Sequence, residues 1–316
     1  MYQNPYTDLS FGEFFWQLIL RLSQFLQGKL AFHQMASDEI QIAVLCGIAA
    51  SSALVGTFLV LRKMTMLANS ISHTILAGIV VAYIIFPDSH GHGGEGVLNI
   101  QAMLAAALAM GVLTAFLTEF LTKVARLQED ASTGIVFTTL FSIGIILVTL
   151  LTRNAHIGTE AVMGNVDALH INDCKLVYAI LLGNLFLCFL FFKEYKITAF
   201  DSGLARALGI SPVFYNYLLM TQVSATSIGA FRAVGVLMVL AFLTGPVLTA
   251  RLLTDRLGSM LGYAVGIGCL ASVIGVALAR HILTIYGAAL STAGLVVCVI
   301  VALFVIVQAR KLFQVS

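Results

Sequence analysis

Stretches of about twenty apolar residues follow one another from about residue 40 to residue 308, with no polar linker between them. A helix needs about 20 apolar residues to cross a hydrocarbon core roughly 30 Å thick, and inside lipid every backbone N–H and C=O has to be paired. The runs therefore predict membrane-spanning helices in one membrane domain, not strands. Hydrophobic residues make up 59% of the chain and charged residues only 10%, which excludes an ordinary soluble domain.

We predict an all-α integral membrane protein, a polytopic bundle of eight to ten transmembrane helices. Nine runs are long enough, and they cover residues 40–61, 65–86, 101–122, 132–152, 174–192, 213–231, 233–250, 259–279 and 286–308. The short joint around Arg232 is also compatible with a re-entrant or broken helix. Charged residues interrupt residues 1–37, so we expect an N-terminal amphipathic segment at the membrane surface and a single transmembrane domain over residues 38–316.

Lysine and arginine are distributed unevenly between the two ends of the predicted helices. If the connection after the first span is cytoplasmic, one side collects Arg62, Lys63, Lys123, Arg126, Lys193, Lys196, Arg206, Arg251, Arg256, Arg310 and Lys311, and the other collects Arg153, Lys175, Arg232 and Arg280. This bias predicts a cytoplasmic C-terminus. The net charge is only +2, which gives no reason to expect a nucleic-acid partner.

One ionisable side chain lies deep in a predicted span. His73 is about eight residues into the second run, roughly 12 Å from its cytoplasmic end. The i, i+4 spacing puts Asn69 on the same helical face, and an imidazole with an amide oxygen can bind a transition-metal ion weakly. The alternative is a neutral histidine that is hydrogen-bonded to a neighbouring helix.

Other metal-binding patterns are weaker. His90, His92 and Glu95 lie in one predicted outer loop, and a second outer segment contains His156, Glu160, Asp167 and His170. Both segments could collect metal, but neither has the tight spacing of a structural zinc site, and solvated loops are the alternative. The five cysteines are scattered singly, which favours small apolar packing residues.

Several motifs do not occur in the sequence. It has no G-x-x-x-x-G-K-[ST] phosphate loop, no nucleophile elbow and no H-E-x-x-H pair. We therefore expect no enzymatic activity, no catalytic residue and no permanently bound cofactor, and any ATPase has to be a separate chain. The spans also lack the several buried carboxylates typical of a proton-coupled carrier. Gly258, Gly262 and Gly266 let another helix approach closely, either within this chain or from a second subunit.

Four stretches resemble a known family, the permease subunits of bacterial zinc, manganese and iron ABC importers. They are VGTFLVLRKMTMLANSISHTILAG (residues 55–78), EDASTGIVFTTLFSIGIIL (129–147), AFDSGLARALGI (199–210) and FRAVGVLMVLAFLTGPVLTARLLTDRLGSML (231–261). The resemblance implies a type II importer fold in the bacterial inner membrane. It also implies partners: cytoplasmic ABC ATPase subunits, a second permease subunit and an extracytoplasmic metal-binding protein.

The resemblance assigns roles to two segments. Residues 199–210 would form the coupling helix region against the ATPase, through Asp201, Leu204, Ala205, Leu208 and Gly209. In the second span the family pattern is Gly-Asp-Ala-x-Ser-His, whose Asp and His line the metal path. Here His73 matches the histidine, but Asn69 and Ala68 replace the aspartate and the glycine.

An amide lacks the charge that a carboxylate offers to a cation, so this subunit should bind metal weakly by itself. A heteromeric importer, in which a non-identical permease supplies the aspartate, is therefore favoured over a homodimer. The implied function is import of Mn²⁺, Zn²⁺ or Fe²⁺ driven by ATP. The alternative is a secondary metal-ion transporter or channel without an ATPase, which should carry more charged residues in its spans.

Overall fold

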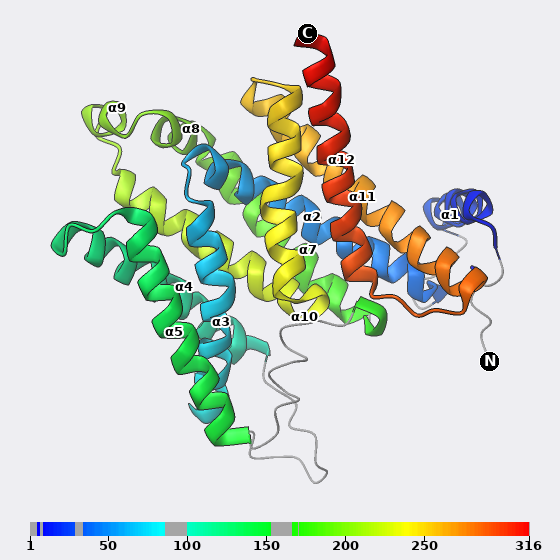
Figure 1. Cartoon of the computed structure of the whole chain (residues 1–316), viewed down its shortest axis with the longest axis horizontal. Helices are drawn as coiled ribbons and strands as arrows, with labels where there is room; N and C mark the ends of the chain where they lie inside the picture. Colours follow the sequence, from blue (N-terminus) through cyan, green and yellow to red (C-terminus); the bar gives the residue numbers. More distant parts are fainter. Residues whose placement is uncertain are drawn as a thin grey trace.

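The computed structural model describes residues 5–6, 9–28, 34–85, 100–152, 166–169 and 171–315, and in this part of the chain it contains helices and no strand (Figure 1). The helical class is therefore confirmed. The elements are α1 Phe11–Leu26, α2 Ser37–Leu61, α3 Thr65–Ile85, α4 Ile100–Val124, α5 Glu129–Thr152, the 3₁₀ turn η2 Val166–Ala168, α7 Ile171–Leu190, α8 Phe192–Phe200, α9 Ser202–Ala207, α10 Pro212–Leu253, α11 Leu257–Tyr286 and α12 Thr292–Val315.

Each of the nine predicted spans lies largely on a helix, in the part of the chain that the structure describes. Five helical segments are by themselves long and apolar enough to cross a membrane, counted over the described residues: Ser37–Leu61, Asp130–Leu147, Asp173–Leu190, Leu257–Tyr286 and Thr292–Phe313. The predicted boundary between the eighth and ninth spans was wrong, because α11 continues to Tyr286 and α12 begins only at Thr292. Gly287 ends α11 in the left-handed conformation that glycine adopts without strain.

The sixth and seventh predicted spans are the two parts of α10. They meet at Gly235, whose φ of 73° and ψ of 171° are not helical. Only glycine adopts this backbone conformation readily, so the break falls there and not at Arg232, three residues earlier. Figure 1 shows the second part of α10 turning back toward the end of the molecule from which the first part starts.

Helix α2 is at the centre of the packing. It contacts α7, α10 and α11, while α3, α4 and α5 pack on one another and reach the rest of the bundle through α10. Gly56 allows α2 to approach the backbone of α10 closely, because a Cβ at this position would lie 2.1 Å from the carbonyl oxygen of Leu243. The side chains of Val44, Leu45 and Phe58 on α2 are fully buried.

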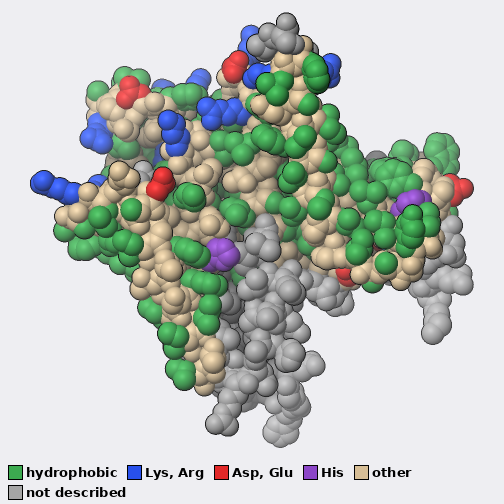
Figure 2. Space-filling view, in the orientation of Figure 1, with side chains coloured by type: hydrophobic (Ala, Val, Ile, Leu, Met, Phe, Trp, Pro, Cys, Tyr) green, Lys and Arg blue, Asp and Glu red, His purple; other side chains and the backbone are tan. Residues whose placement is uncertain are grey.

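Basic side chains gather at one end of the bundle. Figure 2 shows Lys and Arg along the upper rim, the end where α8, α9 and the C-terminus lie. Ten of the eleven residues predicted to be cytoplasmic are exposed: Lys63, Lys123, Arg126, Lys193, Lys196, Arg206, Arg251, Arg256, Arg310 and Lys311. The segregation of charge that underlies the predicted topology is therefore present in the folded chain.

The predicted N-terminal amphipathic segment contains α1. The backbone N–H and hydroxyl of Ser10 donate to the Glu13 carboxylate at 2.8 Å, which caps the helix and lowers the pKa of Glu13. Tyr6 is buried and donates to Glu39 at 2.8 Å, and burial raises the pKa of its phenol. Arg21 pairs with Glu39 as well, so α1 is fastened to the start of α2.

Candidate functional site

His73 lies on the face of α3 that packs against α5. Its ring centroid is 5.2 Å from that of Phe137 and 5.4 Å from that of Phe141, and these two phenylalanine rings are stacked on each other. Asn69, one turn earlier, is half-buried, as is His73 itself. The ring is therefore partly open at the surface of the single chain, between aromatic neighbours.

Close packing fixes this part of α3 on two sides. Gly144 of α5 brings the helices together, since a Cβ there would lie 3.1 Å from the Cβ of Ala77. On the α4 side, the hydroxyls of Thr74 and Thr114 are hydrogen-bonded at 2.9 Å. The imidazole consequently sits on a rigid support, although no group of three His, Cys, Asp or Glu side chains that could hold a metal forms among the described residues.

The segment predicted to couple to an ATPase forms the short helix α9. Asp201 caps it, because its carboxylate accepts hydrogen bonds from the backbone N–H groups of Gly203 and Leu204 at 2.8 and 3.0 Å. Gly209 turns the chain after the helix with a φ of 76°. The side chains of Leu204 and Leu208 are 51% and 58% exposed at the basic end of the molecule.

Ala205 differs from the other residues predicted for this segment. Its side chain is fully buried, so it anchors α9 and does not present a surface. The prediction grouped it with the contact residues because the sequence alone does not show which side of a six-residue helix faces inward.

Helix α8 ties this region to the membrane helices. The buried Tyr195 hydroxyl donates to Oε1 of Gln222 on α10 at 2.7 Å, and burial raises the pKa of this phenol. Arg62, directly after α2, donates to Thr198 of α8. These two contacts join α8 to α10 and to the end of α2, and the sequence did not predict them because they connect residues 27 and 136 positions apart.

A second polar cluster lies in the core between α2, α7 and α10. The Asn184 amide donates to the hydroxyls of Ser51 and Thr226 at 2.7 Å each, and all three side chains are buried. Asn184 was not predicted as a candidate, because no histidine, carboxylate or basic residue of its helix lies near it in the way that His73 lies near Asn69. An amide in the middle of the apolar run of α7 is the signal that could have found it.

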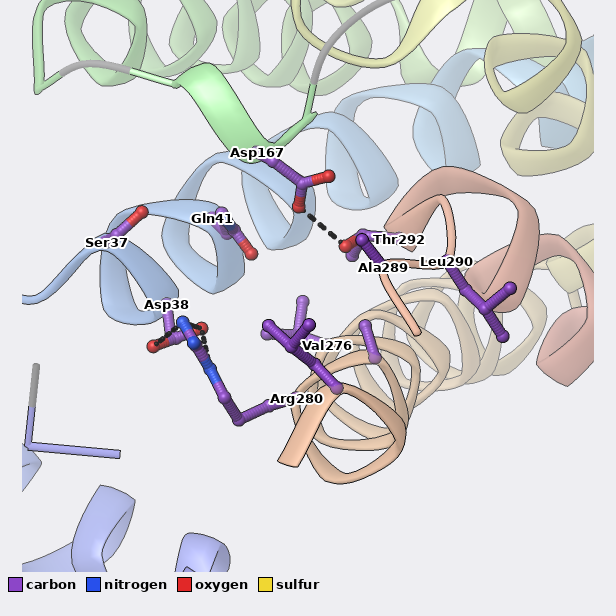
Figure 3. A pocket seen from close by; sticks show the side chains of 11 residues that line it. Ser37, Asp38, Gln41, Asp167, Val276, Arg280, Ala289, Leu290 and Thr292 are labelled. Atoms are coloured by element: carbon purple, nitrogen blue, oxygen red, sulfur yellow. Dashed lines mark hydrogen bonds and ion pairs between the residues drawn. The ribbon is translucent and has the colours of Figure 1, made fainter. Parts of the chain in front are cut away.

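A cavity of about 300 Å³ opens near the ends of α2 and α11, at η2 and the start of α12 (Figure 3). Arg280 donates to both carboxylate oxygens of Asp38, at 2.6 to 3.0 Å. The Thr292 hydroxyl donates to Asp167 at 2.8 Å. Both carboxylates therefore hold neighbouring helices together, and Arg280, predicted only as an outer positive charge, is part of an ion pair.

The remaining metal-collection predictions fall outside the described residues. These are His90, His92 and Glu95 in one segment and His156, Glu160 and His170 in the other. Asp167 is described, and its hydrogen bond to Thr292 gives it a structural role.

Known proteins match almost the whole chain. Residues 36–311 match the model of the ABC 3 transport family. A Chlamydia muridarum protein named "Probable metal transport system membrane protein" is 42% identical over 96% of this chain and 93% of its own length. The manganese transport system membrane protein MntD of Bacillus subtilis is 39% identical over 75% of this chain and 80% of its own length.

A solved structure supports the same relationship. The chain superimposes with a TM-score of 0.73 on a chain of PsaBC from Streptococcus pneumoniae, solved in complex with Fab, with 25% identity. The match covers 90% of this chain and 95% of the other. The helical arrangement described above is therefore found in an experimentally determined relative.

Proposed function

The chain belongs to the ABC 3 transport family, and from this premise we propose that it is the membrane-spanning subunit of an ATP-driven importer for a divalent transition metal. The observation that carries the proposal is the match over residues 36–311, which includes every predicted membrane span. Relatives at about 40% identity are named as metal or manganese transport system membrane proteins. The transported ion, Mn²⁺, Zn²⁺ or Fe²⁺, is cargo and not a resident cofactor.

The energy source is a separate polypeptide. The sequence carries no phosphate-binding loop, so ATP is hydrolysed by a partner ATPase at the cytoplasmic end. The exposed Leu204 and Leu208 give α9 an apolar surface at the basic end of the molecule, where a protein partner can cover them. The contacts of α8 with α2 and α10 then carry the partner's movement into the membrane domain.

The ion passes His73. The imidazole is the one histidine, carboxylate or basic side chain near the middle of a predicted span, it is partly open, and α4 and α5 hold its helix rigidly. Asn69 contributes an amide oxygen one turn away. Because this pair carries no negative charge, a second, non-identical permease supplies a carboxylate on the opposite side of the path, and a homodimer is the alternative assembly.

A free helix face is available for that second subunit. Gly258, Gly262 and Gly266 of α11 are exposed, and among the described residues no atom of another element lies within 4 Å of the positions that their Cβ atoms would occupy. Small residues on a lipid-facing helix let a second helix approach closely. In-chain packing, the other reading of these glycines, is not seen in the described structure.

An extracytoplasmic binding protein delivers the ion at the opposite end from α9.

Reconstitution tests this function. The chain, the second permease and the ATPase are placed together in liposomes, and uptake of Mn²⁺ or Zn²⁺ is measured with ATP, without ATP, and with an ATPase variant unable to hydrolyse ATP. Uptake only with hydrolysable ATP is expected. Uptake by this chain alone, driven by an ion gradient, would establish a secondary carrier and overturn the proposal.

The coupling surface is tested separately. Leu204→Asp combined with Leu208→Asp should weaken ATPase binding at least about tenfold, because the charges would be buried against an apolar partner surface. Leu253→Asp is the matched control, since Leu253 ends α10 near the same end and is 50% exposed. Equal binding by the double variant and the control would remove α9 from the interface.

A further inference from the structure

Two cysteines that are far apart in the sequence meet where α2 and α11 cross. The Sγ atom of Cys46 lies 4.0 Å from the carbonyl oxygen of Cys269, and the Sγ atom of Cys269 lies 3.8 Å from the carbonyl oxygen of Cys46. The contact is reciprocal, so the two side chains lie alongside each other. Two cysteines that are far apart in the sequence are therefore neighbours in the folded chain.

Small residues next to the pair explain the close crossing. Gly268 of α11 faces Ala49 of α2, and a Cβ on Gly268 would lie only 3.0 Å from the Cβ of Ala49. Helices that approach this closely bring short side chains such as cysteine within reach of the opposite backbone. The geometry is fixed by the backbone and needs no rearrangement of flexible side chains.

The thiols are partly exposed, and a cavity lies near them. Cys46 and Cys269 are each only partly buried. A cavity of about 390 Å³ is lined by Ala43, Val273 and Tyr178, and the first two lie about one helical turn from Cys46 and Cys269. Its lining is mostly apolar, apart from the ion pair of Arg21 and Glu39.

We propose that Cys46 and Cys269 form a binding site for a thiophilic divalent metal ion such as Hg²⁺, distinct from the transport path at His73. Each thiol loses one proton, each sulfur forms one bond to the metal, and the products are a neutral S–metal–S bridge and two protons. No electron is transferred. Soft thiolate ligands select soft ions, and the neutral product avoids the cost of an unpaired charge among apolar helices.

The two-ligand geometry sets the class of ion. No group of three His, Cys, Asp or Glu side chains forms among the described residues, so ions that require four protein ligands are not satisfied at this crossing. An ion that prefers two sulfur ligands finds both of them at this crossing. The bridge would fasten α2, the central helix of the bundle, to α11.

The test uses the full chain in detergent and needs neither ATP nor a partner protein, so its result does not depend on the proposed transport function. Cys174, Cys188 and Cys298 are replaced by alanine, leaving the pair. The protein is exposed to HgCl₂ and then to an excess of a monothiol, and bound mercury is measured by intact mass. One mercury atom per chain should remain, because two-point attachment slows its loss by roughly 10²-fold.

Two single variants in the same background, Cys46→Ala and Cys269→Ala, are the matched controls. Each keeps one thiol and should release its mercury to the monothiol, while the helical circular dichroism spectrum stays the same. Mercury should also raise the unfolding temperature of the paired protein but not of the single variants. Equal retention in the pair and the single variants, or no retention in the pair, would overturn the proposal, as would a pair found as a disulfide that takes up no metal.

Discussion

His73 and Asn184 are both polar side chains in apolar helices, yet their surroundings differ. The Asn184 amide is buried and donates two hydrogen bonds of 2.7 Å to side chains of α2 and α10. The His73 ring is half-buried and packs on two phenylalanine rings of α5. Asn184 finds its partners within the chain, whereas the ring of His73 has only aromatic neighbours among the described residues.

This difference distinguishes a residue with a structural role from a residue with a functional role. A polar group in hydrocarbon needs partners, and where the chain supplies them the group stabilises helix packing. A polar group that stays partly exposed at a rigid position costs free energy in the bilayer and does not stabilise helix packing. This combination is typical of a site that binds a ligand or an ion. The comparison predicts that the two residues respond to substitution in opposite ways.

The largest expected effect is on transport by the His73→Ala variant. Uptake by the reconstituted complex should fall at least about tenfold, because the ion loses its imidazole ligand. The unfolding temperature should change little, since His73 makes ring contacts with α5 but no hydrogen bond to another helix among the described residues. Unchanged uptake by a folded variant would remove His73 from the path.

The next effect is on stability of the Asn184→Ala variant. Loss of two buried hydrogen bonds should lower the free energy of unfolding by about 1–2 kcal/mol, measured by unfolding in detergent. The intrinsic uptake of the folded fraction should be unchanged. A variant as stable as the parent but inactive would reverse the roles assigned to the two residues.

A smaller effect is expected from Asn69→Asp, which adds a carboxylate one turn from His73. Electrostatic attraction should lower the KM for the metal about fivefold, or about 1 kcal/mol. Asn184→Asp makes the same chemical change away from the path and should not lower KM. Equal KM values for both variants would separate Asn69 from the ion.

The smallest effect tests one bond of the core cluster. Thr226→Val keeps the shape of the side chain and removes one acceptor of Asn184, together with the contact of its hydroxyl with Ser51 and its bond to the carbonyl of Gln222, so stability should fall by about 0.6 kcal/mol. The Asn184→Ala and Thr226→Val changes should not be additive, because they remove the same hydrogen bond. Full additivity in the double variant would show that the bond contributes nothing.

Local properties of the sequence were enough to predict the helices. Span length and apolar content depend on consecutive residues, and the predicted runs for α2, α3 and α4 agree with the structure within a few residues. The break in α10 was expected near Arg232 and lies at Gly235, since a charge indicates an interruption but a glycine permits it. Asp201 and Gly209 were named because the family resemblance assigns them to the coupling region, and the structure shows that they form a helix cap and a turn.

Contacts between distant helices could not be predicted in this way. The Asp38–Arg280 pair spans 242 positions and the Cys46–Cys269 contact spans 223, and both depend on which helices become neighbours. The aromatic surroundings of His73 depend likewise on the packing of α3 against α5. The sequence identified the residue, and only the fold shows that its ring remains half open.

The most direct test of the account is the water accessibility of position 73 in the assembled importer. His73→Cys is introduced into a background in which the five native cysteines are replaced, and labelling by a charged, membrane-impermeant thiol reagent is measured from each side, with and without ATP. Labelling should occur, should switch sides with the nucleotide state, and should be slowed by the transported metal. Labelling only by a lipid-soluble reagent, in every state, would place residue 73 against lipid and contradict the proposed path.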